Sequence, residues 1–371
     1  MNLAKPEVWV EIDLSALRHN ASAVKQSLPS GVALMAVVKG NGFGHSYVEP
    51  AKAFVAAGAA MLGVTRLEEA LELRNGGVTA PILLLAPIQA DNAAIAIEND
   101  LICAVDSLPL ATALSEASAG TGVKAKIHIK VDTGMGRLGV LPDETPGLVR
   151  EIASLKNVDI AGIFTHFATA TEKNLAPAEK QLQKFGDVVR ALKSAGLPVG
   201  IVHAANSAAT LRMPAAHLDM VRVGTLLYGQ YPAAYLPKTI DLRPTWRLKA
   251  RLCSVREVPT GTRIGYGGEY VTQRKTRIGV CPIGFADGFT MIPEGPFYRL
   301  SPLGFFARKR KRSLTVTIHN RYAPVLGRVS MQLTVVDLTD IPKAQPGDEV
   351  IVPALRLATN PHIPRVYLET F

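Results

Sequence analysis

The sequence has few cysteines, and their distribution excludes two classes of protein. Its 371 residues include only three, Cys103, Cys253 and Cys281, which lie far apart without the spacing of metal ligands. A sparse, odd count argues against a disulfide framework and fits a reducing, cytoplasmic compartment. We expect each cysteine to be a small buried core residue, and we expect no metal site.

Long apolar runs are also missing. The most apolar stretch, residues 81–90, is shorter than the roughly 20 residues that a helix needs to cross a bilayer. Glu7, Glu11 and Asp13 stand where a signal peptide would place its apolar region. We therefore expect neither a signal peptide nor a membrane partner.

The charge balance is basic, but it carries no nucleic-acid motif. The formal net charge is +10, and the basic residues are dispersed except for one run at 308–312. No aromatic RNA-binding pattern accompanies that run, so we interpret it as a solvated loop and expect no nucleic-acid partner. A hydrophobic share of 48% excludes a globally disordered chain.

Eight short apolar runs dominate the first two thirds of the chain. They cover residues 33–39, 61–65, 81–87, 101–106, 125–132, 158–166, 200–206 and 218–224. Continuous apolar runs, without strict alternation, are typical of parallel strands buried on both faces. Helical patterns separate them, most clearly at 66–74 and 179–195, and another helix at 13–28 precedes the first run. Eight strand–helix repeats predict an α/β fold, a (β/α)8 TIM barrel. A doubly wound sheet is the alternative, but no GxGxxG follows the first strand.

The pattern changes after about residue 230. Runs at 245–258, 277–284, 314–320, 323–329 and 332–338 are rich in β-formers and separated by Gly and Pro turns. They predict a mostly β C-terminal domain. We place the barrel at 13–235 and the β domain at 236–371, with the strand in residues 1–12 joining the latter. Residues 287–312 form a long connection.

Active sites of such barrels form at the carboxyl ends of the strands. The polar residues at these ends are Lys39, Lys130, Asp132, Thr165, His166, Asn206, Ser207 and Arg222. Burial after the run ALMAVV should lower the pKa of Lys39, which suits a lysine that binds a carbonyl cofactor. Ser207 opens a helical pattern, so it is a candidate helix N-cap and anion ligand, and Gly224-Thr225 follows the last strand.

The motif AVVKGNGFGHS around Lys39 resembles the cofactor-lysine motif of the alanine racemase family, pyridoxal-phosphate-dependent enzymes of fold type III. Further matching segments are KVDTGMGRLGV (130–140), FTHFATA (164–170), HAANSAAT (203–210), LDMVRVGTLLYG (218–229), RIGYGG (263–268), CPIGFADGF (281–289), VLGRVSMQLTVVDLTDIP (325–342) and IPRVY (363–367). The resemblance covers essentially the whole chain and implies the same fold. It implies a cytoplasmic isomerase that interconverts L- and D-alanine and supplies D-alanine for peptidoglycan.

The resemblance also implies roles for particular residues. Lys39 would hold pyridoxal 5'-phosphate and act as one catalytic base, and Tyr266 would be the other. Arg137 and Met331 would bind the substrate carboxylate, and Lys130 matches a position that is often carbamylated. The cofactor would contact His166, Asn206, Ser207, Arg222, Gly224 and Thr225. A homodimer with shared active sites is implied, in which Tyr266 comes from the partner.

The sequence departs from the family pattern at several places, one of which is Gln332, where the family usually has an aspartate after Met331. Phe43 and Phe285 replace tyrosines, and the C-terminal segment lacks a tyrosine that narrows the substrate entrance. These departures keep open a racemase of a broader amino-acid range, such as serine, lysine or ornithine. A decarboxylase of the same barrel family lacks its C-x-S-x-D motif here, and a non-catalytic cofactor-binding protein is the remaining alternative.

Overall fold

The computed structural model describes residues 6–291 and 314–371. The predicted connection at 287–312 and the basic run at 308–312 therefore lie largely or wholly outside the described residues. The chain forms two compact units. One comprises Asp13–Thr245 with Glu369–Phe371, and the other comprises Met1–Ile12 with Trp246–Leu368.

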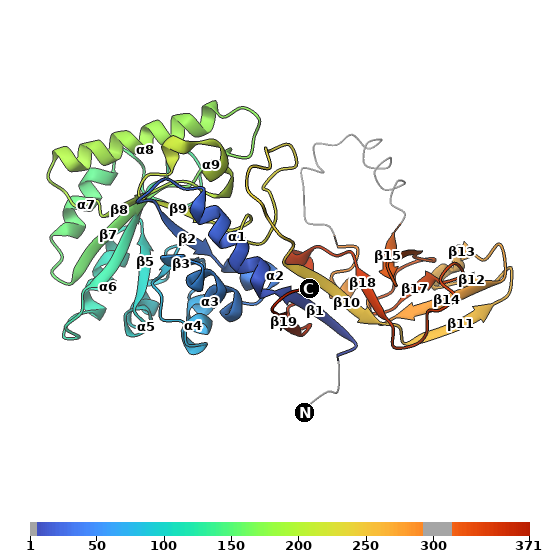
Figure 1. Ribbon diagram of the computed structural model, residues 1–371. Coiled ribbons are helices and arrows are strands. Elements are labelled where there is room, and N and C mark those ends of the chain that lie inside the picture. Colours follow the sequence, from blue (N-terminus) through green and yellow to red (C-terminus); the bar gives the residue numbers. More distant parts are fainter. Residues whose placement is uncertain (1–5, 292–313) are drawn as a thin grey trace. The chain divides into compact units, whose positions relative to one another are not determined.

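The larger unit is the predicted barrel. Its eight parallel strands close in sequence order: β2 (Ala33–Val37), β3 (Met61–Val64), β4 (Ile82–Leu84), β5 (Leu101–Val105), β6 (Ala125–Lys130), β7 (Val158–Phe164), β8 (Ile201–His203) and β9 (Met220–Val223). Each predicted apolar run contains one of them. Four of them, β3, β4, β5 and β9, are buried along their whole length. Helices cover the outer face of the barrel (Figure 1), so its strands are shielded from water on both sides.

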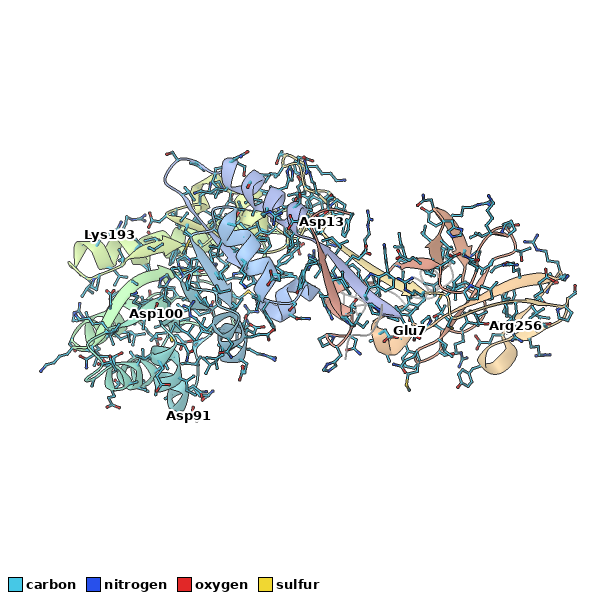
Figure 2. The ribbon with its side chains drawn as sticks, turned by 60° about the horizontal axis from the view of Figure 1, so that its bottom comes forward. Glu7, Asp13, Asp91, Asp100, Lys193 and Arg256 are labelled. Carbon is cyan, nitrogen blue, oxygen red and sulfur yellow. The ribbon has the colours of Figure 1, made fainter. Side chains whose placement is uncertain are left out.

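Helices alternate with the strands around this barrel (Figure 1). Their bounds are α1 (Leu14–Gln26), α3 (Val48–Ala56), α4 (Leu67–Asn75), α5 (Ala93–Glu98), α6 (Leu108–Ala117), α7 (Thr145–Ala153), α8 (Ala176–Ser194) and α9 (Ser207–Arg212). Helix α1 begins where Asp13, labelled in Figure 2, accepts a hydrogen bond from Ala16 N at 2.7 Å. Helix α4 ends at the predicted Gly76-Gly77 stop signal. None of the helices in the described part of the chain is long and apolar enough to cross a membrane.

The second unit is built from strands, as predicted. A six-stranded sheet has the order β16-β15-β18-β10-β1-β19, and a three-stranded sheet has the order β11-β14-β17. The bounds of the first sheet are β16 (Arg321–Pro324), β15 (Thr315–Ile318), β18 (Glu349–Val352), β10 (Trp246–Arg251), β1 (Val8–Asp13) and β19 (Arg365–Leu368). Those of the second are β11 (Ser254–Val258), β14 (Thr276–Cys281) and β17 (Thr334–Asp337), and β12 (Arg263–Ile264) pairs with β13 (Tyr270–Val271).

Several details differ from the sequence prediction. The run 245–258 is two strands in different sheets, because the chain leaves one sheet between Arg251 and Ser254. The run 323–329 contributes only the end of β16 and one bridge at Val325. Cys103 and Cys281 are buried as expected, but Cys253 is exposed and lies in the short connection between β10 and β11.

Candidate active site

A cavity of about 460 Å³ opens at the carboxyl ends of the barrel strands. The predicted site residues that line it are Lys39, Lys130, Arg137, His166, Asn206, Ser207, Arg222, Gly224 and Thr225. They come from segments after or at the ends of β2, β6, β7, β8 and β9. The closed barrel therefore brings together residues that are up to 186 positions apart in sequence, the distance from Lys39 to Thr225.

Lys39 begins an unusual left-handed turn, α2 (Lys39–Gly44). Gly40, Asn41, Gly42 and Phe43 have φ between 52° and 62°, a region that favours glycine and asparagine and strains other residues. The buried carboxylate of Glu69 pins the start of this turn, because it accepts a hydrogen bond from Gly40 N at 2.7 Å. The turn leaves Lys39 accessible from the cavity.

Four basic side chains converge on the cavity: Lys39, Lys130, Arg137 and Arg222. Among the described residues that line it there is no Asp or Glu. Burial, followed by the charge of Arg137, lowers the pKa of Lys39, as predicted from its position. Burial, with the charges of Arg222 and Arg137, lowers the pKa of Lys130 to about 7. The cavity thus has a large deficit of negative charge, which an anionic ligand would supply.

Lys130 lies against the wall of the barrel. Its Nζ donates to Leu85 O at 3.2 Å and lies 4.3 Å from the centre of the Phe164 ring. Asp106 opposes the fall in its pKa only in part. A lysine whose pKa is about 7 is neutral in roughly half of the molecules near pH 7, which makes it reactive toward electrophiles.

Arg137 is presented by a loop that Asp132 organises. The Asp132 carboxylate accepts backbone hydrogen bonds from Gly134, Met135, Gly136 and Arg137 at 2.8–3.2 Å. Burial raises the pKa of Asp132, but these four N–H groups outweigh it and hold the pKa below its usual range. The side chain of Arg137 is exposed, while its backbone is fixed by the hydrogen bond to Asp132.

Arg222 lies inside the barrel, where both terminal nitrogens of its guanidinium have hydrogen-bond partners. Its Nη2 donates to Thr165 O at 2.6 Å and Ala204 O at 2.9 Å, and its Nη1 lies 3.0 Å from His203 Nδ1. Burial lowers its pKa to about 9, so the guanidinium stays charged at pH 7. His166 Nδ1 lies 3.3 Å from Arg222 Nη2, and burial together with this charge lowers the pKa of His166 to about 3. His166 is therefore neutral.

The opposite wall of the cavity joins α9 to the end of β9. The prediction that Ser207 is the N-cap is wrong: Asn206 is the cap, and its Oδ1 accepts from Ala208 N and Ala209 N at 3.1 Å. Ser207 instead accepts a hydrogen bond from Gly224 N at 3.1 Å. A Cβ on Gly224 would lie 2.7 Å from the Phe43 ring, so any residue other than glycine at position 224 would displace that ring.

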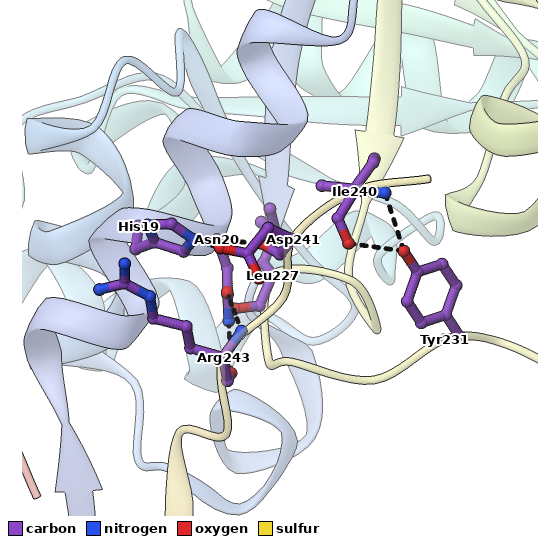
Figure 3. Close-up of polar contacts among 7 residues, drawn as sticks. All are labelled: His19, Asn20, Leu227, Tyr231, Ile240, Asp241 and Arg243. Atoms are coloured by element: carbon purple, nitrogen blue, oxygen red, sulfur yellow. Dashed lines mark hydrogen bonds and ion pairs between the residues drawn. The ribbon is translucent and has the colours of Figure 1, made fainter. Parts of the chain in front are cut away.

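Pro232 lines the cavity from a long segment after β9. Figure 3 shows how this segment is tied to α1: Asn20 Nδ2 donates to Leu227 O and Arg243 O, and Asn20 Oδ1 accepts from Arg243 N at 2.7 Å. The Tyr231 hydroxyl closes the loop by donating to Ile240 O at 2.6 Å. The predicted domain boundary after residue 235 falls inside this segment. The hydrogen bonds of Asn20 and Tyr231 fix the segment that contributes Pro232 to the cavity wall.

The lining of this cavity includes neither Tyr266 nor Met331, and both belong to the second unit. Tyr266 is 70% exposed and begins the turn η3 (Tyr266–Gly268). Met331 is 60% exposed, and its carbonyl accepts from Ala286 N at 3.0 Å. Phe285 is also exposed on this unit. The expected roles of Tyr266 as a base and of Met331 in substrate binding therefore require that these residues reach a cavity of this kind, which the contacts within each unit do not show.

Comparison with known proteins assigns the chain to a family. Residues 12–232 match the model of the alanine racemase N-terminal domain, and residues 245–363 match that of the C-terminal domain. The alanine racemase of Desulfovibrio desulfuricans is 39% identical over 381 residues, which cover 98% of each chain. That of Methanococcus maripaludis is 38% identical over 93% of this chain and 88% of the other.

Solved structures agree. Alanine racemase from Clostridium difficile 630 has a TM-score of 0.89 at 31% identity, covering 98% of this chain and 96% of that one. Another structure of that protein is a complex with cycloserine. The fold and the cavity are those of a racemase, an isomerase that acts on amino acids. This chain belongs to the alanine racemase family.

Sequence reasoning missed three buried side chains that contact residues of the site: Glu69 on Gly40, and His128 and His203 on the side of Arg222. Glu69 lies in a helical pattern, and His128 and His203 lie within apolar runs, where we read them as strand residues. One signal was available: His128 precedes Lys130 by two positions, and alternate residues of a strand point to the same face.

Proposed function

We propose that the protein is a pyridoxal-phosphate-dependent racemase that interconverts L- and D-alanine and supplies D-alanine for peptidoglycan. The observation that carries this proposal is the convergence of four basic side chains on a cavity whose described lining contains no acidic residue. Pyridoxal phosphate brings a phosphate, and alanine brings a carboxylate. Together they supply the negative charge that the cavity lacks.

The residues present fit this cofactor. Lys39 is an accessible amine with a lowered pKa, as needed to bond the aldehyde. Asn206, Ser207, Gly224 and Thr225, which all line the cavity, would hold the phosphate, and a Cβ on Gly224 would collide with the Phe43 ring beside it. When bound, the cofactor withdraws electrons from the substrate Cα and acidifies its proton.

Arg222 would face the pyridine nitrogen, with His166 beside the ring. Its recorded bonds occupy Nη2 and one hydrogen of Nη1, so Nε and the second Nη1 hydrogen remain for the cavity side. With a pKa of about 9, it donates a hydrogen bond but does not protonate the nitrogen as a carboxylic acid would. This limits electron withdrawal and disfavours transamination and decarboxylation.

Racemisation requires a base on each face of the substrate. Lys39 Nζ would remove or return the Cα proton on one face, and Tyr266 Oη on the other. Arg137 and the Met331 backbone would bind the substrate carboxylate. Lys130, with its pKa near 7, would react with carbon dioxide to form a carbamate, which adds an anion beside Arg137. Labelled bicarbonate followed by carbon NMR tests that modification.

The site is completed by a homodimer, in which Tyr266 comes from a second copy. Two features support this: Tyr266 lies in a different compact unit from Lys39, and its large aromatic side chain is 70% exposed. Mixing inactive Lys39→Ala and Tyr266→Ala chains should restore part of the activity, because one hybrid site regains both bases. Lack of recovery despite demonstrated subunit exchange would contradict a shared site.

The activity itself is tested with purified protein loaded with pyridoxal phosphate and a panel of L-amino acids. The proposal predicts that L-alanine racemises fastest. Faster turnover of serine, lysine or ornithine would favour a broader racemase. Release of carbon dioxide would indicate a decarboxylase, and cofactor binding without turnover would indicate a non-catalytic protein.

A further inference from the structure

Behind Arg222, away from the cavity, two histidines form a buried chain. His203 Nδ1 lies 3.0 Å from Arg222 Nη1, and His203 Nε2 lies 2.8 Å from His128 Nδ1. Both histidines have no exposed surface, and Arg222 is only 4% exposed. His128 does not line the cavity, and nothing in the proposed reaction uses it.

The chemistry of these groups determines the direction of each hydrogen bond. Arginine has donors but no acceptor, so His203 Nδ1 must accept from Arg222. His203 must then carry its proton on Nε2, because an imidazole that accepts at both nitrogens would be an anion. It follows that His203 Nε2–H donates to His128 Nδ1, and that His128 carries its own proton on Nε2.

This arrangement has an internal cost. His128 Nε2 is buried and has no hydrogen-bond partner among the described residues. A buried N–H without a partner is unfavourable, and such groups in folded proteins call for an explanation. The reverse tautomer would remove the acceptor that His203 needs. The unpaired N–H is therefore tolerated so that His128 can accept at Nδ1.

The backbone is shaped around this ring. His128 is opposite Gly162 on β7, where the β6–β7 pairing shifts register after Ile127. A Cβ on Gly162 would lie 2.6–2.8 Å from three atoms of the His128 ring. The φ of Gly162 is not in the left-handed region, so the contact with the ring explains the glycine. An irregularity of this kind changes the direction of a side chain, and here it lets the His128 ring lie over Gly162.

We propose that His128 is a positioning residue for Arg222, acting through His203 as the neutral Nε2–H tautomer. It ends the chain of hydrogen bonds that holds the guanidinium toward the cavity. Without an acceptor at that position, His203 would have an unpaired buried donor and no fixed orientation, and Arg222 would lose a partner. The predicted effect on catalysis rests on the proposed function, whereas the predicted protonation sites of the two histidines do not.

The test compares three variants with a matched control. His128→Asn keeps an acceptor near the Nδ1 position, His128→Leu removes it at similar volume, and Gly162→Ala displaces the unchanged ring. Ile102→Ala is the control, because it also creates a defect in the barrel interior but lies in a separate apolar cluster. Each variant is measured for kcat, for KM, and for the pyridoxal phosphate dissociation constant.

We expect His128→Leu and Gly162→Ala to lower kcat by about tenfold, the consequence of one unpaired buried donor. Both should weaken cofactor binding and leave KM for alanine within about twofold of the parent value. His128→Asn and Ile102→Ala should stay near the parent. If His128→Leu does not fold, the contrast between Gly162→Ala and His128→Asn decides the question.

Nitrogen-15 NMR of the histidine rings in the cofactor-free protein gives a readout independent of activity. It should show His203 and His128 both protonated at Nε2. A proton on His203 Nδ1, or a His128→Leu variant that matches Ile102→Ala in kcat and cofactor affinity, would overturn the proposal. Absence of alanine racemisation in the parent would instead refute the proposed function and leave the tautomers to be judged by NMR.

Discussion

The barrel interior contains two clusters that are equally buried and chemically opposite. The apolar cluster consists of Met35, Met61, Leu83, Ile102 and Met220. The polar cluster consists of His128, Lys130, His203 and Arg222, each at most 6% exposed. Met220 and Arg222 are two residues apart on β9, so their side chains leave the same face of one strand. Strand β9 therefore contributes Met220 to the apolar cluster and, two residues further along the same face, Arg222 to the polar cluster.

The two clusters are stabilised by different means. Apolar side chains gain free energy from the area they remove from water, and any well-fitting neighbour serves. A buried guanidinium gains nothing from area and needs an acceptor for each donor. Within the described residues no carboxylate neutralises Arg222; its recorded partners are the carbonyl oxygens of Thr165 and Ala204 and the Nδ1 atoms of His203 and His166. The polar cluster thus serves function at the expense of stability.

The largest effect should come from Tyr266→Phe. This variant tests whether the polar cluster and Lys39 can catalyse racemisation without a second base. Loss of a general base lowers racemisation by about 10²–10⁴-fold, while the cofactor stays bound because Lys39 is intact. Deuterium exchange at Cα should be lost for one enantiomer of alanine more than for the other. Equal loss for both, with cofactor retained, would return Tyr266 to a structural role.

Arg222→Met replaces the charged side chain at the centre of the polar cluster with an apolar one. We expect racemisation to fall by about 10²-fold, as when a preorganised donor is removed. The free energy of unfolding should change less, because relief of the buried charge offsets the acceptors left unpaired. Steady-state kinetics and urea unfolding of the same preparation measure both quantities. A large loss of stability with normal turnover would contradict the division between the clusters.

Leu83→Ala is the converse change in the apolar cluster. Its side chain is fully buried, and truncation of such a leucine costs about 2–5 kcal/mol of unfolding free energy. The folded fraction should retain nearly normal kcat. Thermal unfolding and activity per folded molecule check this, and a specific loss of kcat would show that the two clusters are coupled.

The polar cluster should also make stability depend on pH. Burial and the charge of Arg222 lower the pKa of His128 to about 4 and that of His166 to about 3, and the pKa of His203 falls well below its usual value for the same reasons. The unfolded chain therefore binds more protons below about pH 6.5, and stability is lost as the pH falls. His128, with its pKa of about 4, should contribute on the order of 1–2 kcal/mol between pH 7 and pH 5, and His203 should act in the same direction. His128→Asn should reduce this dependence, and Ile102→Ala should not.

The smallest effect is expected for Phe43→Tyr. The Phe43 ring lines the cavity and stacks on Tyr228 with ring centres 4.8 Å apart. A hydroxyl there should tighten pyridoxal phosphate binding by about 2- to 10-fold, the value of one hydrogen bond. Phe285→Tyr, on the exposed surface of the second unit, is the control and should leave the dissociation constant unchanged.

Much of this arrangement could be predicted from the sequence. The barrel strands are short apolar runs because both of their faces are buried, and this pattern is visible without a structure. Strands β18 and β19 were missed, because each has four residues and lies in a Pro-rich segment without clear alternation. The left-handed turn after Lys39 was not predictable either, since it requires Phe43, a residue that this region disfavours, to adopt a positive φ.

The site was predicted less completely for a physical reason. Strand-end residues such as Lys39 and Arg222 stand out because they are polar after apolar runs. His128 and His203 do not, because both lie inside apolar runs, and the position of His128 depends in addition on the register shift opposite Gly162. Asn206 and Ser207 are both good N-caps, and the choice between them depends on Gly224 N, which takes the Ser207 hydroxyl as its acceptor.

The central claim is that the four basic side chains of the cavity hold an anionic cofactor on Lys39. Borohydride reduction of the protein loaded with pyridoxal phosphate, followed by peptide mapping, tests it most directly. We predict a single pyridoxyl group, on Lys39, with none on Lys130 although its pKa is also low. A label on Lys130, or labelling distributed over surface lysines, would contradict this account of the cavity.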